Sequence, residues 1–368
     1  MKRTYIPVAQ PALIGFESKY VNDCLVTSWI SSKGKYIELF EREFANYVGV
    51  KYAASCSNGT VALHLALLAA GVKSGDEIIC PTFTYVATAN SISYVGASPV
   101  LVDCEDATFN IDATKIEKVI TKQTKAILIA HIYGHPCEMD EILKVAKKHN
   151  LILIEDGAEA LGSVYRGKMI GGFGHIATFS FFGNKVITTG EGGMVVTNNK
   201  KFDAAIRLYK GQGVDPIKQY WFKVLGYNYR MTNIQAAIGL AQLKNIKKFL
   251  NKRRLIASWY NKSLSDLEGI FLPIEKEYVY HSYWMYSILV RKGKDRNKLM
   301  AYLKKQNIET RPFFYPMHIM PVHNQGECHL PISVDISKRG INLPTFYDLT
   351  RQEVEYISSK IREYFMGK

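Results

Sequence analysis

The chain lacks the features of secreted and membrane-spanning proteins. No uncharged apolar run of the ~18 residues that a membrane span requires occurs in its 368 residues. Residues 1–7, MKRTYIP, contain no apolar segment of the signal-peptide kind, so we expect no secretory leader. The six cysteines lie far apart without a C-x-x-C pair, which indicates reduced thiols. We therefore expect a cytoplasmic protein without a membrane partner.

The chain is also short of acidic residues, and this shortage has two interpretations. Its 33 Asp and Glu residues against 47 Lys and Arg residues give a net charge of +14. Such a charge suits either nucleic-acid binding or an enzyme that handles anionic ligands in a basic cleft. No helix-turn-helix, zinc-finger or RNA-recognition signature occurs. The densest basic cluster, residues 244–254, alternates with apolar residues at helical spacing, so we interpret it as a solvated helix face and expect no nucleic-acid partner.

Standard zinc-binding spacing is absent as well. The C-terminal half contains His318, His323, Cys328 and His329, but their spacing matches no zinc motif. We expect no metal and interpret these as loop residues, of which His318 alone is a candidate for a functional role.

Short apolar runs alternate with helical patterns through the first half of the chain. Four runs are typical of strands, and helices are expected between them: residues 77–80, 99–103, 126–130 and 151–154. This alternation predicts an α/β fold with a mostly parallel central sheet and helices on both of its faces. A length of 368 residues favours two domains.

The second half of the chain predicts a smaller C-terminal α+β domain. One long helix over about 234–265 is expected to link the two parts, followed by a strand at 283–290 and a helix at 296–306. We therefore place a large domain at residues 1–245 and a small domain at residues 246–368. Whether residues 1–15 pack on the small domain is left open.

Two segments of the large domain could serve a ligand. Residues 57–60, Ser-Asn-Gly-Thr, precede an apolar helix, and N–H groups at a helix start favour an anion. Simple capping by Ser57 or Asn58 is the commoner explanation of such a segment. Asp156 follows the strand at 151–154, at the sheet edge where ligands of open α/β sheets bind, although it could equally cap the next helix. Tyr85 is expected at the same edge.

A third segment, residues 179–193, is typical of a strand, a Gly-rich turn and a second strand, with Lys185 displayed at the turn. Taken alone, Lys185 is best interpreted as a solvated loop residue. The three segments together match the needs of pyridoxal phosphate (PLP). This cofactor requires a lysine amine, an anion site for its phosphate and a carboxylate beside its pyridine nitrogen, and an aromatic side chain can stack on its ring.

Four sequence blocks carry a resemblance to a known family: SNGTVAL at 57–63, EDGAEA at 155–160, SFFGNK at 180–185 and GEGGM at 190–194. Over essentially its whole length the chain resembles the sugar-nucleotide aminotransferases of the DegT/StrS type, which have the fold type I architecture. The resemblance implies that Lys185 forms the covalent Schiff base with PLP and carries the proton, and that Asp156 pairs with the pyridine nitrogen. The other cofactor contacts that it implies are Tyr85 on the ring, Gly59, Thr60 and Ser180 at the phosphate, Glu159 near the hydroxyl, and Asn228 from a second subunit.

The resemblance also implies a reaction and partners. Glutamate would supply the amino group, and C4 of a 4-keto-6-deoxyhexose carried on a nucleotide would receive it, in a homodimer with shared active sites. The related dehydratase branch has histidine in place of the lysine, so Lys185 favours amine transfer. The substrate contacts that we infer are Trp29, Ser31, Arg230, Tyr315 and His318.

The identity of the sugar is open at this point. The resemblance favours GDP-4-keto-6-deoxymannose as the acceptor. However, Trp221 and Phe222 stand where the family is expected to have a Trp-His pair, so a UDP- or dTDP-linked 4-amino-4,6-dideoxyglucose product is the alternative. A binding or regulatory protein without catalytic activity is a further alternative, because a fold does not determine a function.

Overall fold

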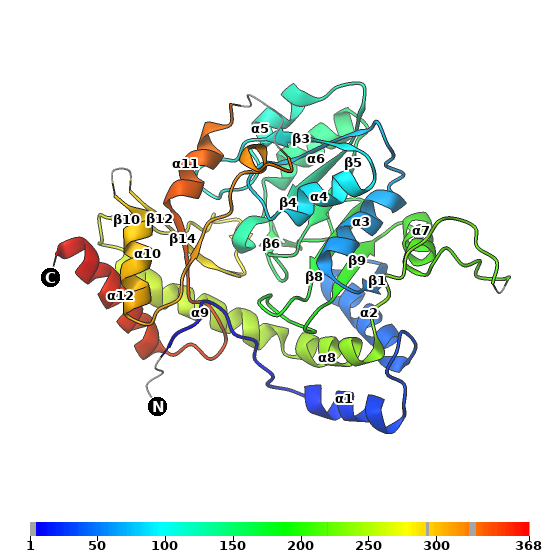
Figure 1. Cartoon of the computed structure of the whole chain (residues 1–368), viewed down its shortest axis with the longest axis horizontal. Coiled ribbons are helices and arrows are strands. Elements are labelled where there is room, and N and C mark those ends of the chain that lie inside the picture. Colours follow the sequence, from blue (N-terminus) through cyan, green and yellow to red (C-terminus); the bar gives the residue numbers. More distant parts are fainter. Residues whose placement is uncertain (1–4, 219, 292–293, 324–328, 368) are drawn as a thin grey trace.

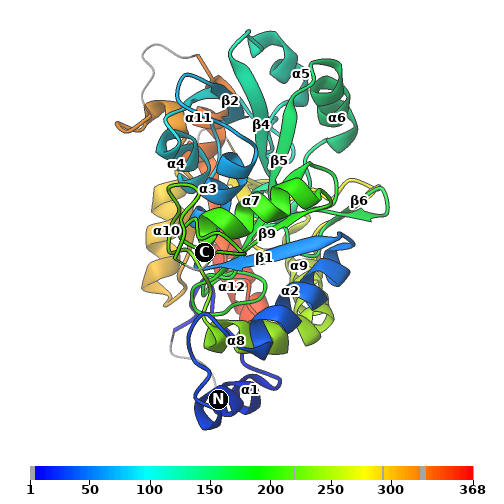
Figure 2. The same ribbon diagram turned by 90° about the vertical axis from the view of Figure 1, so that its right-hand side faces the viewer.

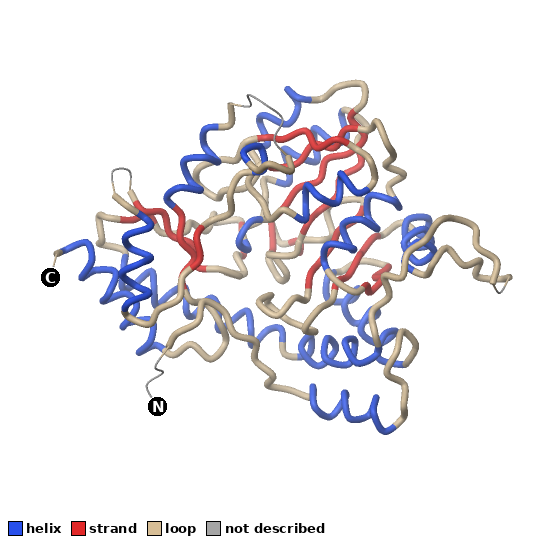
Figure 3. Tube along the Cα trace, viewed as in Figure 1, coloured by secondary structure: helices blue, strands red, loops and turns tan. Residues whose placement is uncertain are grey.

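The computed structural model describes residues 5–218, 220–291, 294–323 and 329–367. Within these ranges, its strands form three sheets of seven, four and three strands, with helices around the two larger ones (Figures 1 and 3). Among the described residues, no helix combines the length and the apolar character needed to cross a membrane. Cys328 lies outside the described residues, whereas the other five cysteines are buried free thiols.

The large sheet has seven strands in the order β1-β9-β8-β5-β4-β2-β3. Only β9 runs antiparallel to its neighbours β1 and β8, and the remaining pairs are parallel. The expected α/β fold with a mostly parallel sheet is therefore confirmed. The strands span β1 (Tyr52–Cys56), β2 (Glu77–Pro81), β3 (Ser98–Val102), β4 (Thr124–Ala130), β5 (Ile152–Asp156), β8 (Ile176–Ser180) and β9 (Gly193–Thr197).

Both faces of the large sheet are covered by helices, which explains why its central strands are continuously apolar. In β4, Ala126 and Leu128 pack with α3 and α4, whereas Ile127 and Ile129 face the side of α6. In Figure 2, α7 crosses in front of β1 and β9. The helices of this part are α1 (Glu17–Val26), α2 (Lys35–Val48), α3 (Gly59–Ala69), α4 (Ala87–Tyr94), α5 (Ala113–Ile116), α6 (Met139–Lys148), α7 (Lys200–Lys210) and α8 (Asn233–Lys244), with short 3-10 turns at η1 (Glu117–Val119) and η2 (Ile132–Gly134).

The small sheet is antiparallel, with the strand order β10-β12-β14-β13. Helix α12 packs on α9 and α10 beside it. The elements are α9 (Ile246–Leu264), β10 (Ile270–Phe271), β12 (Tyr286–Val290), α10 (Arg296–Lys305), β13 (Arg311–Pro312), η3 (Met317–Ile319), α11 (Pro331–Arg339), β14 (Gly340–Leu343) and α12 (Arg351–Met366).

Two strand contacts are among those that join the halves of the chain. Ile6 forms a parallel bridge with Ile308 and is buried in the core of the C-terminal part. Strand β11 (Val279–Tyr280) pairs with β6 (Val164–Tyr165), which in turn pairs with β7 (Lys168–Met169). The domain boundary between residues 245 and 246 stays a prediction.

The expected single linking helix over 234–265 is wrong, because the chain forms α8 and α9 instead. A capping box between Thr232 and Gln235 begins α8. Asn245 has φ −106° and ψ 7°, so it leaves the helical conformation, ends α8 and precedes α9. Its side chain donates a hydrogen bond back to the Ala241 carbonyl, which satisfies one of the carbonyls left free at a helix end.

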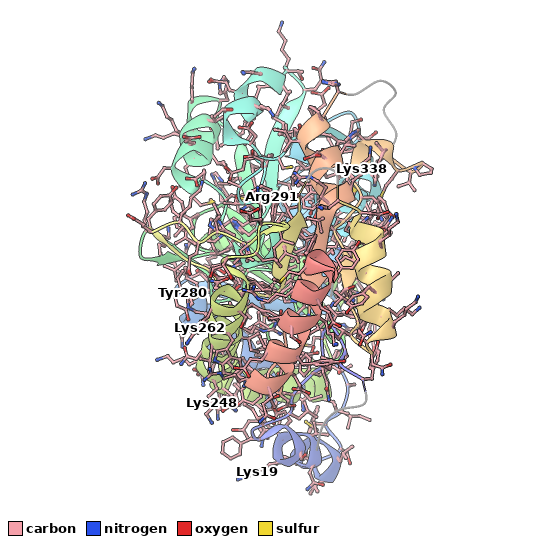
Figure 4. The ribbon with its side chains drawn as sticks, turned by 90° about the vertical axis from the view of Figure 1, so that its left-hand side faces the viewer. Lys19, Lys248, Lys262, Tyr280, Arg291 and Lys338 are labelled. Carbon is pink, nitrogen blue, oxygen red and sulfur yellow. The ribbon has the colours of Figure 1, made fainter. Side chains whose placement is uncertain are left out.

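The basic cluster at 244–254 lies on α8 and α9, and most of it is solvated as expected. Lys247 and Lys248 are exposed, and Figure 4 shows Lys248 and Lys262 on the outer face of the molecule. Arg253 departs from this pattern, because it is only 6% exposed. It lies one helical turn from Phe249, on the buried face of α9.

An aromatic cluster joins β8 to α2 beneath the lysine loop. The ring of Phe179 lies 5.1 Å from that of Phe44, and Phe181 lies 5.2 Å from Phe40 and 5.4 Å from Phe44. All four rings are buried. Since β8 leads directly into the loop that carries Lys185, this cluster fixes the start of that loop.

Replacing Phe179 by alanine should lower the free energy of unfolding by about 3–5 kcal/mol, because a buried ring and its contacts are lost. Urea denaturation followed by circular dichroism measures the change. Phe271→Ala is the matched control, since Phe271 is 49% exposed and its loss should cost less than about 0.5 kcal/mol. Equal losses in the two variants would contradict the assigned role of the cluster.

Candidate active site

A cavity of about 820 Å³ lies where several parallel strands of the large sheet end. Ala130, Asp156 and Ser180, the last residues of β4, β5 and β8, all line it. Gly59 and Thr60, the first residues of α3, also line the cavity. Trp284 and Arg311 come from the C-terminal part, so the two halves of the chain enclose the cavity together.

The cavity brings together most of the site residues predicted from the sequence. Those that line it are Gly59, Thr60, Tyr85, Asp156, Glu159, Ser180 and Lys185. Those that lie outside its lining are Asn228, Trp29, Ser31, Arg230, Tyr315 and His318.

One wall of the cavity is a helix start that fits an anion. The Asn58 side chain caps α3 by accepting from the Val61 N–H at 3.0 Å. The N–H groups of Gly59 and Thr60 have no acceptor within the described residues. A Cβ atom on Gly59 would lie 2.7 Å from Ser180 Cβ and 3.0 Å from its hydroxyl, so only glycine lets α3 approach this close. Two free N–H groups, a hydroxyl and the positive end of the helix dipole suit a phosphate group.

Asp156 is held rigidly at the end of β5. Its Oδ2 accepts from the Thr88 hydroxyl at 2.9 Å, and its Oδ1 accepts from the Ala158 N–H at 3.1 Å. Burial raises the pKa of the Asp156 carboxyl, and these two hydrogen bonds oppose the rise because they favour the charged form. A buried carboxylate of this kind stabilises a cationic group placed beside it.

Lys185 points into the cavity between an acid and an aromatic ring. Its Nζ lies 3.9 Å from Glu159 Oε1 and 3.9 Å from the centroid of the Trp284 ring. The other Glu159 oxygen accepts from the Tyr133 N–H at 2.9 Å. Burial lowers the pKa of the Lys185 amine and raises the pKa of Glu159 to about 7. These opposite shifts bring the proton affinities of the acid and the amine closer together.

The neighbouring acid, Glu155, has a structural role instead. It is fully buried and accepts hydrogen bonds from the N–H groups of Gly171, Phe173 and Gly174. His131 Nε2 lies 3.3 Å from Glu155 Oε2. Burial by itself would raise the pKa of Glu155, but the contacts with His131 and with the backbone lower it overall. Of the two adjacent acids, only Asp156 lines the cavity.

Tyr85 stands at the rim of the cavity, and its ring is available to a ligand. Its side chain is 56% exposed, and its ring centroid lies 5.9 Å from that of Phe314. Stacking on a cofactor ring stays a prediction for this residue.

The predicted substrate contacts lie away from the cavity of their own chain. Trp29, Ser31, Arg230 and Tyr315 are exposed, and Arg230 donates to Asn228 Oδ1 at 3.3 Å. His318 is buried, with its Nδ1 lying 2.7 Å from the Thr82 hydroxyl, so it anchors the loop after β13. Their roles in substrate binding stay predictions.

The structure adds residues that sequence reasoning missed. Trp284 and Asn342 reach the cavity from the C-terminal part, and Thr88 supports Asp156 from α4. Tyr133 was within reach of sequence reasoning, because it follows β4 just as Asp156 ends β5. No local pattern marks Trp284, whose position depends on how the two halves pack.

Comparison with known proteins decides the family. Residues 11–362 match the DegT/DnrJ/EryC1/StrS aminotransferase family. The chain belongs to this family. A related member of the DegT/DnrJ/EryC1/StrS family, the GDP-perosamine synthase of Escherichia coli O157:H7, is 52% identical over 364 residues, covering 99% of this chain and 100% of the relative.

Two further proteins are similar to the chain over nearly its whole length. The GDP-perosamine synthase of Caulobacter vibrioides is 50% identical, and the match covers 96% of each chain. Spr1654 of Streptococcus pneumoniae, solved in a PLP form, superposes with a TM-score of 0.93 at 28% identity, covering 99% of both chains. The expected aminotransferase fold is therefore confirmed.

Replacing Glu159 by glutamine should make the stability of the cofactor-free protein depend less on pH. The pKa of Glu159 is raised from 4.5 to about 7 in the folded chain. Between these two pH values the unfolded chain releases the Glu159 proton more readily than the folded chain, so a rise in pH stabilises the unfolded state. As the pH rises from 4.5 to about 7, the glutamine variant should therefore gain stability relative to wild type. Urea denaturation at several pH values measures the difference.

Glu191→Gln is the matched control, because Glu191 lines the same cavity but is exposed to solvent. A stability difference between wild type and Glu159→Gln that stays constant with pH would contradict the assignment.

Proposed function

We propose that the protein transfers the amino group of glutamate to C4 of GDP-4-keto-6-deoxymannose, forming GDP-perosamine. The observation that carries the proposal is the single cavity that holds Lys185, Asp156 and the helix start at Gly59 and Thr60. Full-length relatives about half identical to the chain are GDP-perosamine synthases, which supports the choice of GDP as the nucleotide.

PLP is the cofactor. When bound, it supplies the carbon that accepts the amino group and a ring that takes up the electrons released as a proton leaves. We assign its phosphate to the N–H groups of Gly59 and Thr60 and to the Ser180 hydroxyl. Asp156 would face its pyridine nitrogen, and Lys185 would bind it covalently.

Lys185 is the residue that holds and moves the proton. Burial lowers the pKa of its amine, so at neutral pH more of it is in the neutral form that can act as a base. Glu159, whose pKa is raised to about 7, lies 3.9 Å from the amine, and its charge favours the protonated form of Lys185. Asp156 keeps its place through Thr88 and Ala158, so that its charge stays fixed while Lys185 changes protonation.

Two alternatives are weaker. The Trp221-Phe222 pair favours a UDP- or dTDP-linked 4-keto sugar, because it departs from the Trp-His pair expected in the family. A binding protein without activity would not need a buried lysine amine paired with a buried acid. We also propose a cytoplasmic location, which the free thiols of the five described cysteines support.

The nucleotide preference is tested with purified protein, PLP, glutamate and 4-keto-6-deoxyhexoses linked to GDP, UDP or dTDP, with products identified by mass spectrometry. We expect kcat/KM for the GDP sugar to exceed that for the other two by at least ~10-fold, because a site that recognises one base by hydrogen bonds leaves its own polar groups unpaired when another base binds. Lys185→Ala should abolish turnover, whereas Lys168→Ala, at an exposed lysine outside the cavity, should not.

Preferential turnover of the UDP or dTDP sugar would contradict the assigned nucleotide. Absence of amine transfer with every sugar would contradict the assigned activity and favour the binding protein.

We further propose that the active form is a homodimer. Residues 211–218 and 220–232, the described part of the loop between α7 and α8, project away from the rest of the chain (Figure 1). This loop displays apolar side chains to solvent, with Ile217 93% and Leu225 85% exposed, and Trp221 and Phe222 are exposed beside them. Contiguous apolar surface of this kind marks a contact with another protein surface. The same loop carries Asn228, which we assign to the cofactor phosphate of the second subunit.

Mixing two inactive variants tests this shared site. Lys185→Ala and Asn228→Ala should each be inactive alone, but co-expression should restore about a quarter of wild-type activity, because half of the dimers are mixed and each holds one intact site. Light scattering establishes that the mixed sample is dimeric. Activity no higher than that of either parent would contradict a site built from two subunits.

A further inference from the structure

Arg253 is a buried cation without an anionic partner among the described residues. Its Nη1 donates to the carbonyls of Trp284 at 2.8 Å and Thr345 at 3.0 Å, and its Nη2 lies 3.5 Å from the Lys185 carbonyl. Burial lowers the pKa of its guanidinium to about 10. Burying a charge that has no counter-charge is costly, so this placement calls for an explanation.

The neighbouring Arg254 shows the ordinary arrangement for an arginine on this helix. It is partly exposed and pairs with Glu275 at 2.6 Å. Arg253 differs because its contacts are backbone carbonyls from both halves of the chain. Those of Trp284 and Thr345 belong to the C-terminal part, and that of Lys185 belongs to the lysine loop.

Trp284 is fixed at both ends. Arg253 holds its carbonyl, and its indole N–H donates to the Asn184 carbonyl at 2.7 Å, one residue before the lysine. The ring therefore has one orientation, with its face toward Lys185. The Lys185 Nζ lies 3.9 Å from the ring centroid, well inside the ~6 Å within which an ammonium is attracted to an aromatic face.

We propose that Trp284 holds the ammonium group of Lys185 whenever this lysine is not bonded to the cofactor, and that Arg253 is a positioning residue for both. The role rests on the proposed function, in which Lys185 alternates between binding the cofactor and carrying a proton. Burial favours the neutral form of the Lys185 amine, whereas Glu159 and the face of the Trp284 ring favour its protonated form. The ring keeps the protonated lysine beside Glu159, in the cavity where the proton is needed.

The experiment uses the cofactor-free protein and measures the rate of PLP uptake, followed by the absorbance of the bound cofactor, as a function of pH. The neutral amine is the form that reacts, so the midpoint of the rate profile reports the pKa of Lys185. Trp284→Leu removes the aromatic face but stays apolar, and should lower the midpoint by about half to one pH unit. Trp284→Phe keeps a weaker aromatic face and should shift it less.

Trp259→Leu is the matched control. The Trp259 ring also lies under a lysine, with Lys252 Nζ 4.9 Å from its centroid, but it is partly buried against the core of the C-terminal part, outside the cavity lining. Its loss should leave the midpoint unchanged. An unchanged midpoint in Trp284→Leu, or an equal shift in Trp259→Leu, would overturn the proposal.

Arg253→Lys tests the positioning role, because lysine keeps the charge but lacks the planar guanidinium fork that spans these separate carbonyls. It should shift the midpoint in the same direction as Trp284→Leu, and Arg254→Lys should not. If Arg253→Lys fails to fold, the two Trp284 variants still decide the proposal. Wild-type protein that takes up no PLP would refute the proposed function itself, whereas normal uptake with an unmoved midpoint in Trp284→Leu would refute only the role of Trp284.

Discussion

The burial of the Lys185 amine is the constraint on which the site depends. A lysine removed from water loses much of its preference for the charged form, and here two buried carboxylates and one aromatic face restore part of it. Each of these groups needs support of its own. Glu159 is held by the Tyr133 N–H, Asp156 by Thr88 and Ala158, and Trp284 by Asn184 and Arg253.

The fold supplies this support from two directions. The large sheet delivers Asp156 and Ser180 at the ends of β5 and β8, and α3 delivers its free N–H groups opposite them. The C-terminal part delivers Trp284 and Arg311. Because Arg253 contacts the backbone of Lys185 as well as that of Trp284, the lysine loop and the C-terminal part are fixed to each other at the place where the chemistry is proposed.

The sequence predicts those features that depend on local pattern. The parallel sheet follows from short apolar runs between helices, and the helix start and Asp156 follow from their places beside such runs. Trp284 could not be found in this way, because its distance from Lys185 depends on the packing of segments ~100 residues apart in sequence, which no local pattern encodes. The break at Asn245 was missed because residues 240–265 contain neither glycine nor proline to mark it. The burial of Arg253 could have been predicted from the sequence, because Arg253 shares the helical spacing of Phe249 and Ile256, which are buried.

The central claim is that this cavity binds PLP through Lys185. The most direct test is to load the protein with PLP, reduce the adduct with borohydride and locate the modified residue by mass spectrometry of the peptides. We expect one modified lysine per chain, at Lys185. Modification of a different lysine, or of none, would contradict it.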